Sequence, residues 1–154
     1  MNSHLVLRRR ASRNVRLSYP PDVHWECVRC ARCCEDAPDR ERRILLLLSE
    51  AHRISQTTGF TVEDFAEPIE GSGHYVIRMR KKDGRCVFLD ENRCKIYAVR
   101  PLVCHFYPVW LRQEGSTYTF GATDVCPGLG KGRHLDRGYY VSLLRLAQAR
   151  LGAP

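Results

Sequence analysis

The sequence lacks an apolar run long enough to cross a membrane. A transmembrane helix needs roughly 20 consecutive, mostly apolar residues. The longest apolar run here covers only residues 44–48, between Arg43 and Ser49. This run predicts a buried strand or the lead-in to a helix, and we expect no membrane association.

An export signal is also missing. A secretory signal places basic residues ahead of an apolar segment, whereas here Arg8–Arg10 follow the short apolar segment Leu5–Leu7. We therefore expect a cytoplasmic, reducing location, where abundant cysteine indicates metal or redox chemistry more often than disulfides. An organelle-targeting peptide is a minority alternative, because residues 1–20 are rich in arginine and contain no acid.

Motifs of the common enzyme classes are absent as well. The glycine-rich stretch 128–132 lacks the lysine followed by serine or threonine that a phosphate-binding loop requires. No serine, histidine and acid stand in a suggestive arrangement for nucleophilic catalysis. Catalytic residues therefore stay unassigned, and the sequence leaves open whether the protein is an enzyme.

Charge is distributed unevenly along the 154 residues. The formal net charge is +8, from 25 basic and 17 acidic residues. Residues 1–20 hold five arginines and no acid, which leaves 20 basic and 17 acidic residues, or +3, in the rest. We interpret 1–20 as a basic, flexible arm. A contact of this arm with nucleic acid is an unspecific alternative, because no array of aromatic residues accompanies the arginines.

Eight cysteines are the dominant feature of the chain. Cys27, Cys30 and Cys33 are separated by two residues each. This spacing occurs in structural zinc sites and in the first three ligands of bacterial ferredoxin clusters. Cys34 adjoins Cys33, and since adjacent side chains usually diverge, we expect that the two do not hold one small ion.

A second group of cysteines lies downstream. The whole set predicts two four-ligand sites, or one cluster with spare thiols, and its grouping stays open. Buried unliganded thiols are an alternative for Cys86 and Cys104, and a disulfide framework is disfavoured by the adjacent pair. His24 and His105 are left out of the ligand set. The candidate metal ligands are Cys27, Cys30, Cys33, Cys34, Cys86, Cys94, Cys104 and Cys126.

The periodicity of the chain predicts a small α+β single domain with short helices and a β-hairpin, organised around cysteine-ligated metal. Helices are expected from Ser49 to Gly59, from Thr61 to Pro68, from Arg100 to Pro108 and over 136–151. A strand over 74–82, a turn at Asp83-Gly84 and a return strand over 86–89 form the hairpin. We expect an arm over 1–20, a metal-binding domain over 21–135 and a C-terminal helix over 136–154 packed on it.

Three segments together resemble the YkgJ-type cysteine-cluster family, which is described as a zinc- or iron-chelating domain. They are the run 27–34, the segment Cys86–Tyr97 and the segment Arg100–Pro108. The resemblance runs from about Cys27 to Cys126. It departs at Ala31, where the family often has glycine, and at Tyr107, where phenylalanine is common.

The resemblance implies metal binding and little else about the chemistry. This type of domain also occurs in flagellin lysine methylases, which are linked to iron–sulfur chemistry. We predict a metal-binding protein that holds an iron–sulfur cluster or zinc, close to evenly balanced, in a structural or electron-handling role. The alternatives are an accessory enzyme of protein methylation or redox modification, and a nucleic-acid-binding zinc module that uses the arm. The metal is the expected partner, and a protein partner is an open option.

Overall fold

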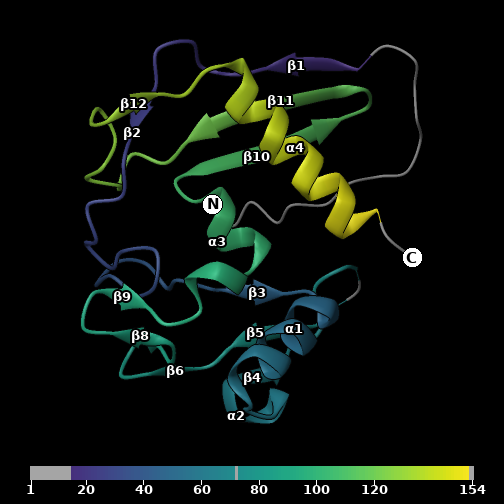
Figure 1. The fold of residues 1–154 in the computed structure, drawn as a ribbon. Coiled ribbons are helices and arrows are strands. Elements are labelled where there is room, and N and C mark those ends of the chain that lie inside the picture. The colour runs from purple at the N-terminus through teal and green to yellow at the C-terminus, as the bar shows by residue number, and fades with distance from the viewer. Residues whose placement is uncertain (1–14, 72, 153–154) are drawn as a thin grey trace. The chain divides into compact units, whose positions relative to one another are not determined.

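The computed structural model describes residues 15–71 and 73–152, which belong to two compact units (Figure 1). The first unit combines the segment up to Val28 with the segment from Phe106 onward, and the second is Arg29–His105. Short helices and small sheets alternate, so the α+β class is confirmed. Arg8, Arg9, Arg10 and Arg13 of the expected basic arm lie outside the described residues.

A three-stranded sheet forms one side of the first unit. Strands β10 (Val109–Glu114) and β11 (Thr117–Ala122) are an antiparallel hairpin that turns at Gly115. Strand β1 (Arg16–Ser18) runs parallel to β11 at its other edge. Arg16–Ser18 therefore extend a sheet, although they fall inside the segment expected to be an arm.

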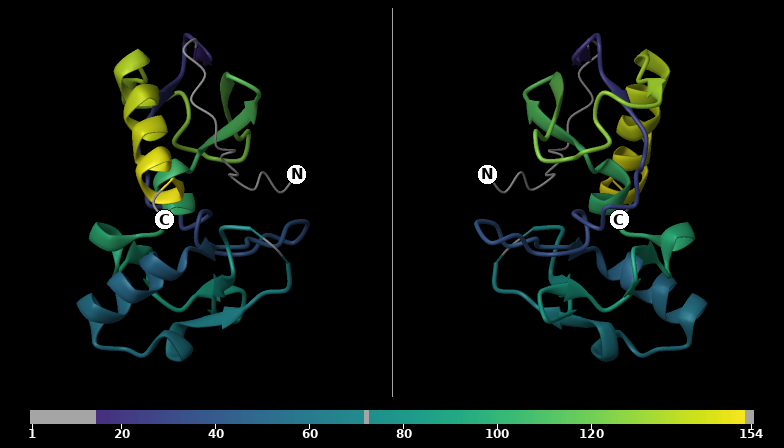
Figure 2. Two further views of the ribbon diagram at one scale, coloured as in Figure 1. Left: turned by 90° about the vertical axis from the view of Figure 1, so that its right-hand side faces the viewer. Right: turned by 90° about the vertical axis from the view of Figure 1, so that its left-hand side faces the viewer.

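Helix α4 (Arg137–Leu151) confirms the helix predicted at the C-terminal end. It begins at Asp136, whose side chain accepts a hydrogen bond from the Tyr139 amide at 2.9 Å. Its buried Tyr140 ring lies against Phe120 of β11 and stacks on Tyr19, with centroids 5.1 and 4.7 Å apart. These ring contacts pack the helix on the sheet. Figures 1 and 2 show α4 crossing one face of the sheet.

A second, very short ribbon completes this unit. Strands β2 (His24–Trp25) and β12 (Arg133–His134) pair antiparallel. Gly128 lies so close to β2 that an added Cβ would collide with the Glu26 carbonyl oxygen. Glycine is therefore required there for the two backbones to approach.

The second unit is built around the sheet β3-β5-β4, made of β3 (Leu45–Leu46), β5 (Ile77–Met79) and β4 (Ala66–Pro68). The apolar run 44–48 thus contains the buried strand β3 and leads directly into α1 (Leu48–Thr58), whose first residue, Leu48, is exposed. Helix α1 ends at Gly59 with φ 78°, and α2 (Val62–Phe65) follows. The apolar core of the unit comprises Ile44, Leu46, Ala51, Ile54, Phe65, Ala66, Ile77, Met79, Phe88 and Ile96, together with Cys34 and Cys86.

Tight turns dominate the rest of the second unit. The predicted turn at Asp83-Gly84 is confirmed, with φ 53° and 73°, between β6 (Lys81–Lys82) and β7 (Arg85–Cys86). The strand expected over 74–82 is interrupted at Arg80, and the expected return strand ends at Cys86. A second hairpin joins β8 (Leu89–Asp90) to β9 (Arg93–Cys94), and the chain continues into the 3₁₀ turn η1 (Tyr97–Val99) and helix α3 (Leu102–Phe106).

Within the described ranges, no helix has both the length and the apolar character needed to span a bilayer.

One buried carboxylate joins distant parts of the second unit. Glu50 is 2% exposed. One of its oxygens accepts the Leu47 amide at 3.0 Å, at the beginning of α1. The other accepts the Leu102 amide at 2.7 Å, at the beginning of α3 and 52 residues along the chain. The side chain therefore fixes the start of α3 against the start of α1.

We expect Glu50→Gln to lower the free energy of unfolding by about 1.5–3 kcal/mol, because the amide replaces one charged acceptor with a donor that faces a backbone N–H. Urea denaturation of the full chain measures the change. Glu63→Gln, on the exposed side of α2, is the control and should shift stability by less than about 0.5 kcal/mol. Equal effects of the two substitutions would contradict the assignment.

Candidate metal centre

Five of the eight cysteines come together in the second unit. Cys34 and Cys86 belong to its buried core, and Cys33, Cys94 and Cys104 pack against that core. The Cys33 thiol interacts electrostatically with those of Cys86, Cys94 and Cys104, and the Cys34 thiol with those of Cys86 and Cys104. We call these five residues the thiol cluster: Cys33, Cys34, Cys86, Cys94 and Cys104.

Local turns deliver each member of the thiol cluster. The Cys34 amide donates to the Ala31 carbonyl at 2.7 Å, which closes a turn beneath the adjacent pair. The Cys86 amide donates to the Cys34 carbonyl at 2.8 Å, which ties β7 to that turn. Cys94 ends β9, and Cys104 lies in α3. Three separate pieces of chain thus converge on the turn that carries the adjacent cysteines.

The adjacent cysteines point the same way. Their Sγ atoms are 3.5 Å apart, so the expectation that the two side chains diverge is wrong. The turn at Ala31, with φ 64°, bends the backbone enough to align them. The hydrogen bond from the Cys34 thiol lowers the pKa of Cys33 to about 7, against the opposing effect of its burial. The same hydrogen bond, together with burial, raises the pKa of Cys34.

Two arginines surround the thiol cluster with positive charge. The Arg42 guanidinium donates to the Cys33 carbonyl at 2.9 Å and lowers the pKa of the Cys33 thiol. The Arg100 guanidinium also lowers the pKa of the Cys33 thiol and opposes the rise in the pKa of Cys94. It donates a hydrogen bond to the Tyr97 carbonyl and lies over the Tyr97 ring. Positive charge beside a thiol favours the thiolate, which is the form that binds metal.

Burial opposes ionisation of the other members of the thiol cluster. It raises the pKa of Cys86 to about 11 and that of Cys104 to about 12, and it raises the pKa of Cys94. Neighbouring thiolates raise all three further. Five thiolates cannot share this space without a compensating cation. A bound metal ion would supply that charge.

The remaining three cysteines are not members of the thiol cluster. Cys30 is partly buried and stands between Arg29 and Ala31, which both have positive φ, at 54° and 64°. Cys27 and Cys126 belong to the first unit, where Cys27 is exposed and Cys126 is buried. There, the Glu26 amide donates to the Gly128 carbonyl at 3.3 Å, which holds the chain next to Cys27 against the turn that follows Cys126.

The donor atoms suit a soft metal, although they are not arranged as a preformed site. All eight cysteines are free thiols. Across residues 15–71 and 73–152, no three His, Cys, Asp or Glu side chains already have metal-binding geometry. Thiolates are the donors that zinc and iron–sulfur clusters prefer.

Two residues that support the thiol cluster have no signal in the sequence. Glu50 lies within a helical pattern, and Arg42 within a polar loop. Their roles depend on contacts with Leu102 and with Cys33 that only the folded chain provides. Arg100, by contrast, stands beside Pro101 at the start of a helix that the sequence predicts.

In the metal-free, reduced protein at pH 7, we expect iodoacetamide to alkylate Cys33 first among the thiol cluster. A thiol of pKa about 7 is half ionised at pH 7, whereas one of pKa about 11 is ionised roughly once in 10⁴ molecules. Peptide mass spectrometry over time measures the rates. Arg42→Gln should slow labelling of Cys33, while Arg53→Gln, on exposed α1, should not. Equal alkylation rates at Cys33 and Cys86 would contradict the lower thiol pKa assigned to Cys33.

We expect Ala31→Gly to raise the free energy of unfolding by up to about 1 kcal/mol. The left-handed conformation strains a residue that has a Cβ, and this gain exceeds the added flexibility of glycine in the unfolded chain. Ala37→Gly is the matched control, because Ala37 in the same loop is not left-handed. This substitution should lower the free energy of unfolding by about 0.5–1 kcal/mol. Thermal denaturation compares the two, and loss of stability in both would refute the strain.

Comparisons with known proteins place the cysteines within a described family. Residues 26–127 match the family CxxCxxCC, described as "Putative zinc- or iron-chelating domain". The chain is 26% identical to uncharacterized protein MJ0661 of Methanocaldococcus jannaschii, over 87% of this chain and 74% of that protein. It is 27% identical to uncharacterized protein MJ0939 of the same organism, over 72% of this chain but only 39% of that protein. No solved structure matches the chain. Because the family match covers about two thirds of its residues, the chain belongs to the CxxCxxCC family of zinc- or iron-chelating domains.

Proposed function

We propose that the thiol cluster of the second unit is the metal centre of this protein and holds zinc or an iron–sulfur cluster in a structural or electron-handling role. The observation that carries the proposal is that three pieces of chain bring Cys86, Cys94 and Cys104 to the turn that carries Cys33 and Cys34. Metal binding in general follows from the family, while the ligands and the metal are part of the proposal.

The electrostatics of the thiol cluster favour a bound metal cation. Burial and mutual repulsion disfavour thiolates at Cys86 and Cys104. Such thiols ionise when a metal replaces their protons. Metal binding therefore releases protons and also stabilises the fold. Arg42 and Arg100 offset part of the negative charge that would remain.

Zinc and an iron–sulfur cluster would give the protein different roles. Zinc would cross-link the turn at 33–34 to β7, β9 and α3, and would supply structural stability without redox chemistry. An iron–sulfur cluster would supply one-electron transfer, with a potential set by burial and by nearby charge. In either case Glu50 would hold α3, and therefore Cys104, in place.

Cys27, Cys30 and Cys126 are the remaining proposed ligands. The two-residue spacing of Cys27, Cys30 and Cys33 is that of the first three ligands of a bacterial ferredoxin cluster, which supports their inclusion among the ligands. Neither alternative function, an accessory enzyme or a nucleic-acid-binding module, gains support from a contact among the described residues. The arginine arm that the second alternative needs lies mostly outside them.

Metal and sulfide analysis of untagged protein purified without oxygen tests the proposal. We expect at least one equivalent of zinc or iron for each chain. Iron with matching acid-labile sulfide and visible absorbance would identify an iron–sulfur cluster, whereas zinc in a colourless protein would identify a zinc site. Absence of bound metal in the anaerobic protein would overturn the proposal.

Serine substitutions assign the ligands. Cys94→Ser and Cys104→Ser should each lower the metal content by at least about half and reduce stability. Thr57→Ser, at an exposed position of α1 outside the proposed ligands, is the control and should retain at least one equivalent. Full metal content in both Cys94→Ser and Cys104→Ser would exclude the thiol cluster as the centre, even if the protein binds metal elsewhere.

A further inference from the structure

Two histidines face each other across the short ribbon of the first unit. His24 of β2 is paired directly with His134 of β12. Their ring centroids are 5.3 Å apart and their planes are inclined by 51°. Both side chains are exposed, and both residues lie outside the segment 26–127 that matches the family. The pair is therefore a feature of this chain that the family assignment does not explain.

Hydrogen bonds to the backbone fix which nitrogen of each ring carries the proton. His24 Nδ1 lies 3.1 Å from the Gly132 carbonyl oxygen, and His134 Nε2 lies 2.6 Å from the Pro21 carbonyl oxygen. A carbonyl oxygen only accepts, so each of these nitrogens donates its N–H. In the neutral rings, the lone pairs are thus on His24 Nε2 and His134 Nδ1. Metal-binding histidines show this same pattern, with one nitrogen on the metal and the other donating to a carbonyl.

The backbone around the pair is held firmly. The His24 carbonyl accepts the Gly130 amide at 2.9 Å, and the Leu135 amide donates to the Val23 carbonyl at 2.8 Å. Leu135, next to His134, is completely buried. Both rings are therefore oriented before any ligand arrives, which reduces the entropy lost on binding.

The spacing of the rings suits a shared metal ion. Two imidazoles bound to one ion at about 2 Å have ring centroids about 5 Å apart, close to the observed 5.3 Å. We propose that His24 and His134 form a second, exchangeable site for a divalent transition-metal ion that prefers imidazole, such as Ni²⁺ or Zn²⁺. Water completes the coordination, since the described residues offer no third side chain in metal-binding geometry.

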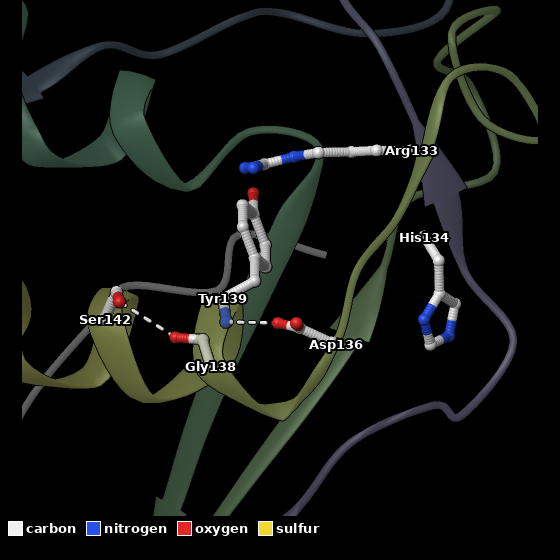
Figure 3. A pocket seen from close by; sticks show the side chains of 6 residues that line it. All are labelled: Arg133, His134, Asp136, Gly138, Tyr139 and Ser142. Atoms are coloured by element: carbon white, nitrogen blue, oxygen red, sulfur yellow. Dashed lines mark hydrogen bonds between the residues drawn. The ribbon is translucent and has the colours of Figure 1, made fainter.

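A polar pocket adjoins His134. It has a volume of about 390 Å³ and lies between β12 and the start of α4. Figure 3 shows Arg133 extending over the Tyr139 ring, while the His134 ring turns in another direction. At the start of α4, the Tyr139 amide donates to the Asp136 side chain at 2.9 Å. The lone pairs of the two rings are the binding feature of this region.

Titration of the full, reduced chain with Ni²⁺, followed by ¹H–¹⁵N NMR of the imidazole rings, tests the site. Paramagnetic Ni²⁺ should broaden the signals of His24 and His134 together, at lower Ni²⁺ concentrations than those of His52. This readout is specific to each ring, so Ni²⁺ bound by the thiol cluster does not obscure it. Failure of the thiol cluster to bind metal would likewise leave this result unaffected.

Matched variants remove the ligand nitrogen and keep the hydrogen bond. His24→Asn retains a donor in the place of Nδ1, and His134→Gln retains one in the place of Nε2. Each should weaken Ni²⁺ binding at the remaining ring about 100-fold, because joining two weak ligands raises affinity by about that factor or more. His52→Asn should leave it unchanged. Unaltered binding in His24→Asn and His134→Gln, or separate broadening of the two rings in the parent chain, would overturn the shared site.

Discussion

The architecture of the second unit depends on a charge placed where charges are rarely found. The Glu50 carboxylate, almost wholly buried, accepts amides at the beginnings of two helices. A buried carboxylate is costly unless its oxygens are satisfied, so this arrangement tolerates little displacement of either helix. Because α3 carries Cys104, the Glu50 carboxylate also helps to fix the position of that thiol.

The thiol cluster is assembled from turns rather than from long regular elements. Each of its cysteines lies within or beside a segment of only a few residues, and single backbone hydrogen bonds tie these segments together. Such a framework has little stability of its own. The apolar core supplies one side of it through Cys34 and Cys86, and a metal would supply the rest. Folding and metal binding should therefore be strongly coupled in this unit.

Local chemistry made part of this structure predictable from the sequence. The helix start at Thr61 and the turn at Asp83-Gly84 are signalled within a few residues, and the apolar spacing over 136–151 indicates a helix. Each forms as expected. Strands β1, β2 and β12 escaped prediction because they are two or three residues long and have partners far along the chain. The convergence of Cys33 and Cys34 was missed for a related reason: it depends on a left-handed alanine that composition does not reveal.

The parallel pairing of β1 with β11 gives the chain a definite order of assembly. The first unit draws on residues from both ends of the sequence, and the second unit is continuous between them. Every residue of the second unit is translated before β11, so this unit can begin to fold while β1 still lacks its partner strand. The three-stranded sheet of the first unit closes only after the whole intervening segment has been made.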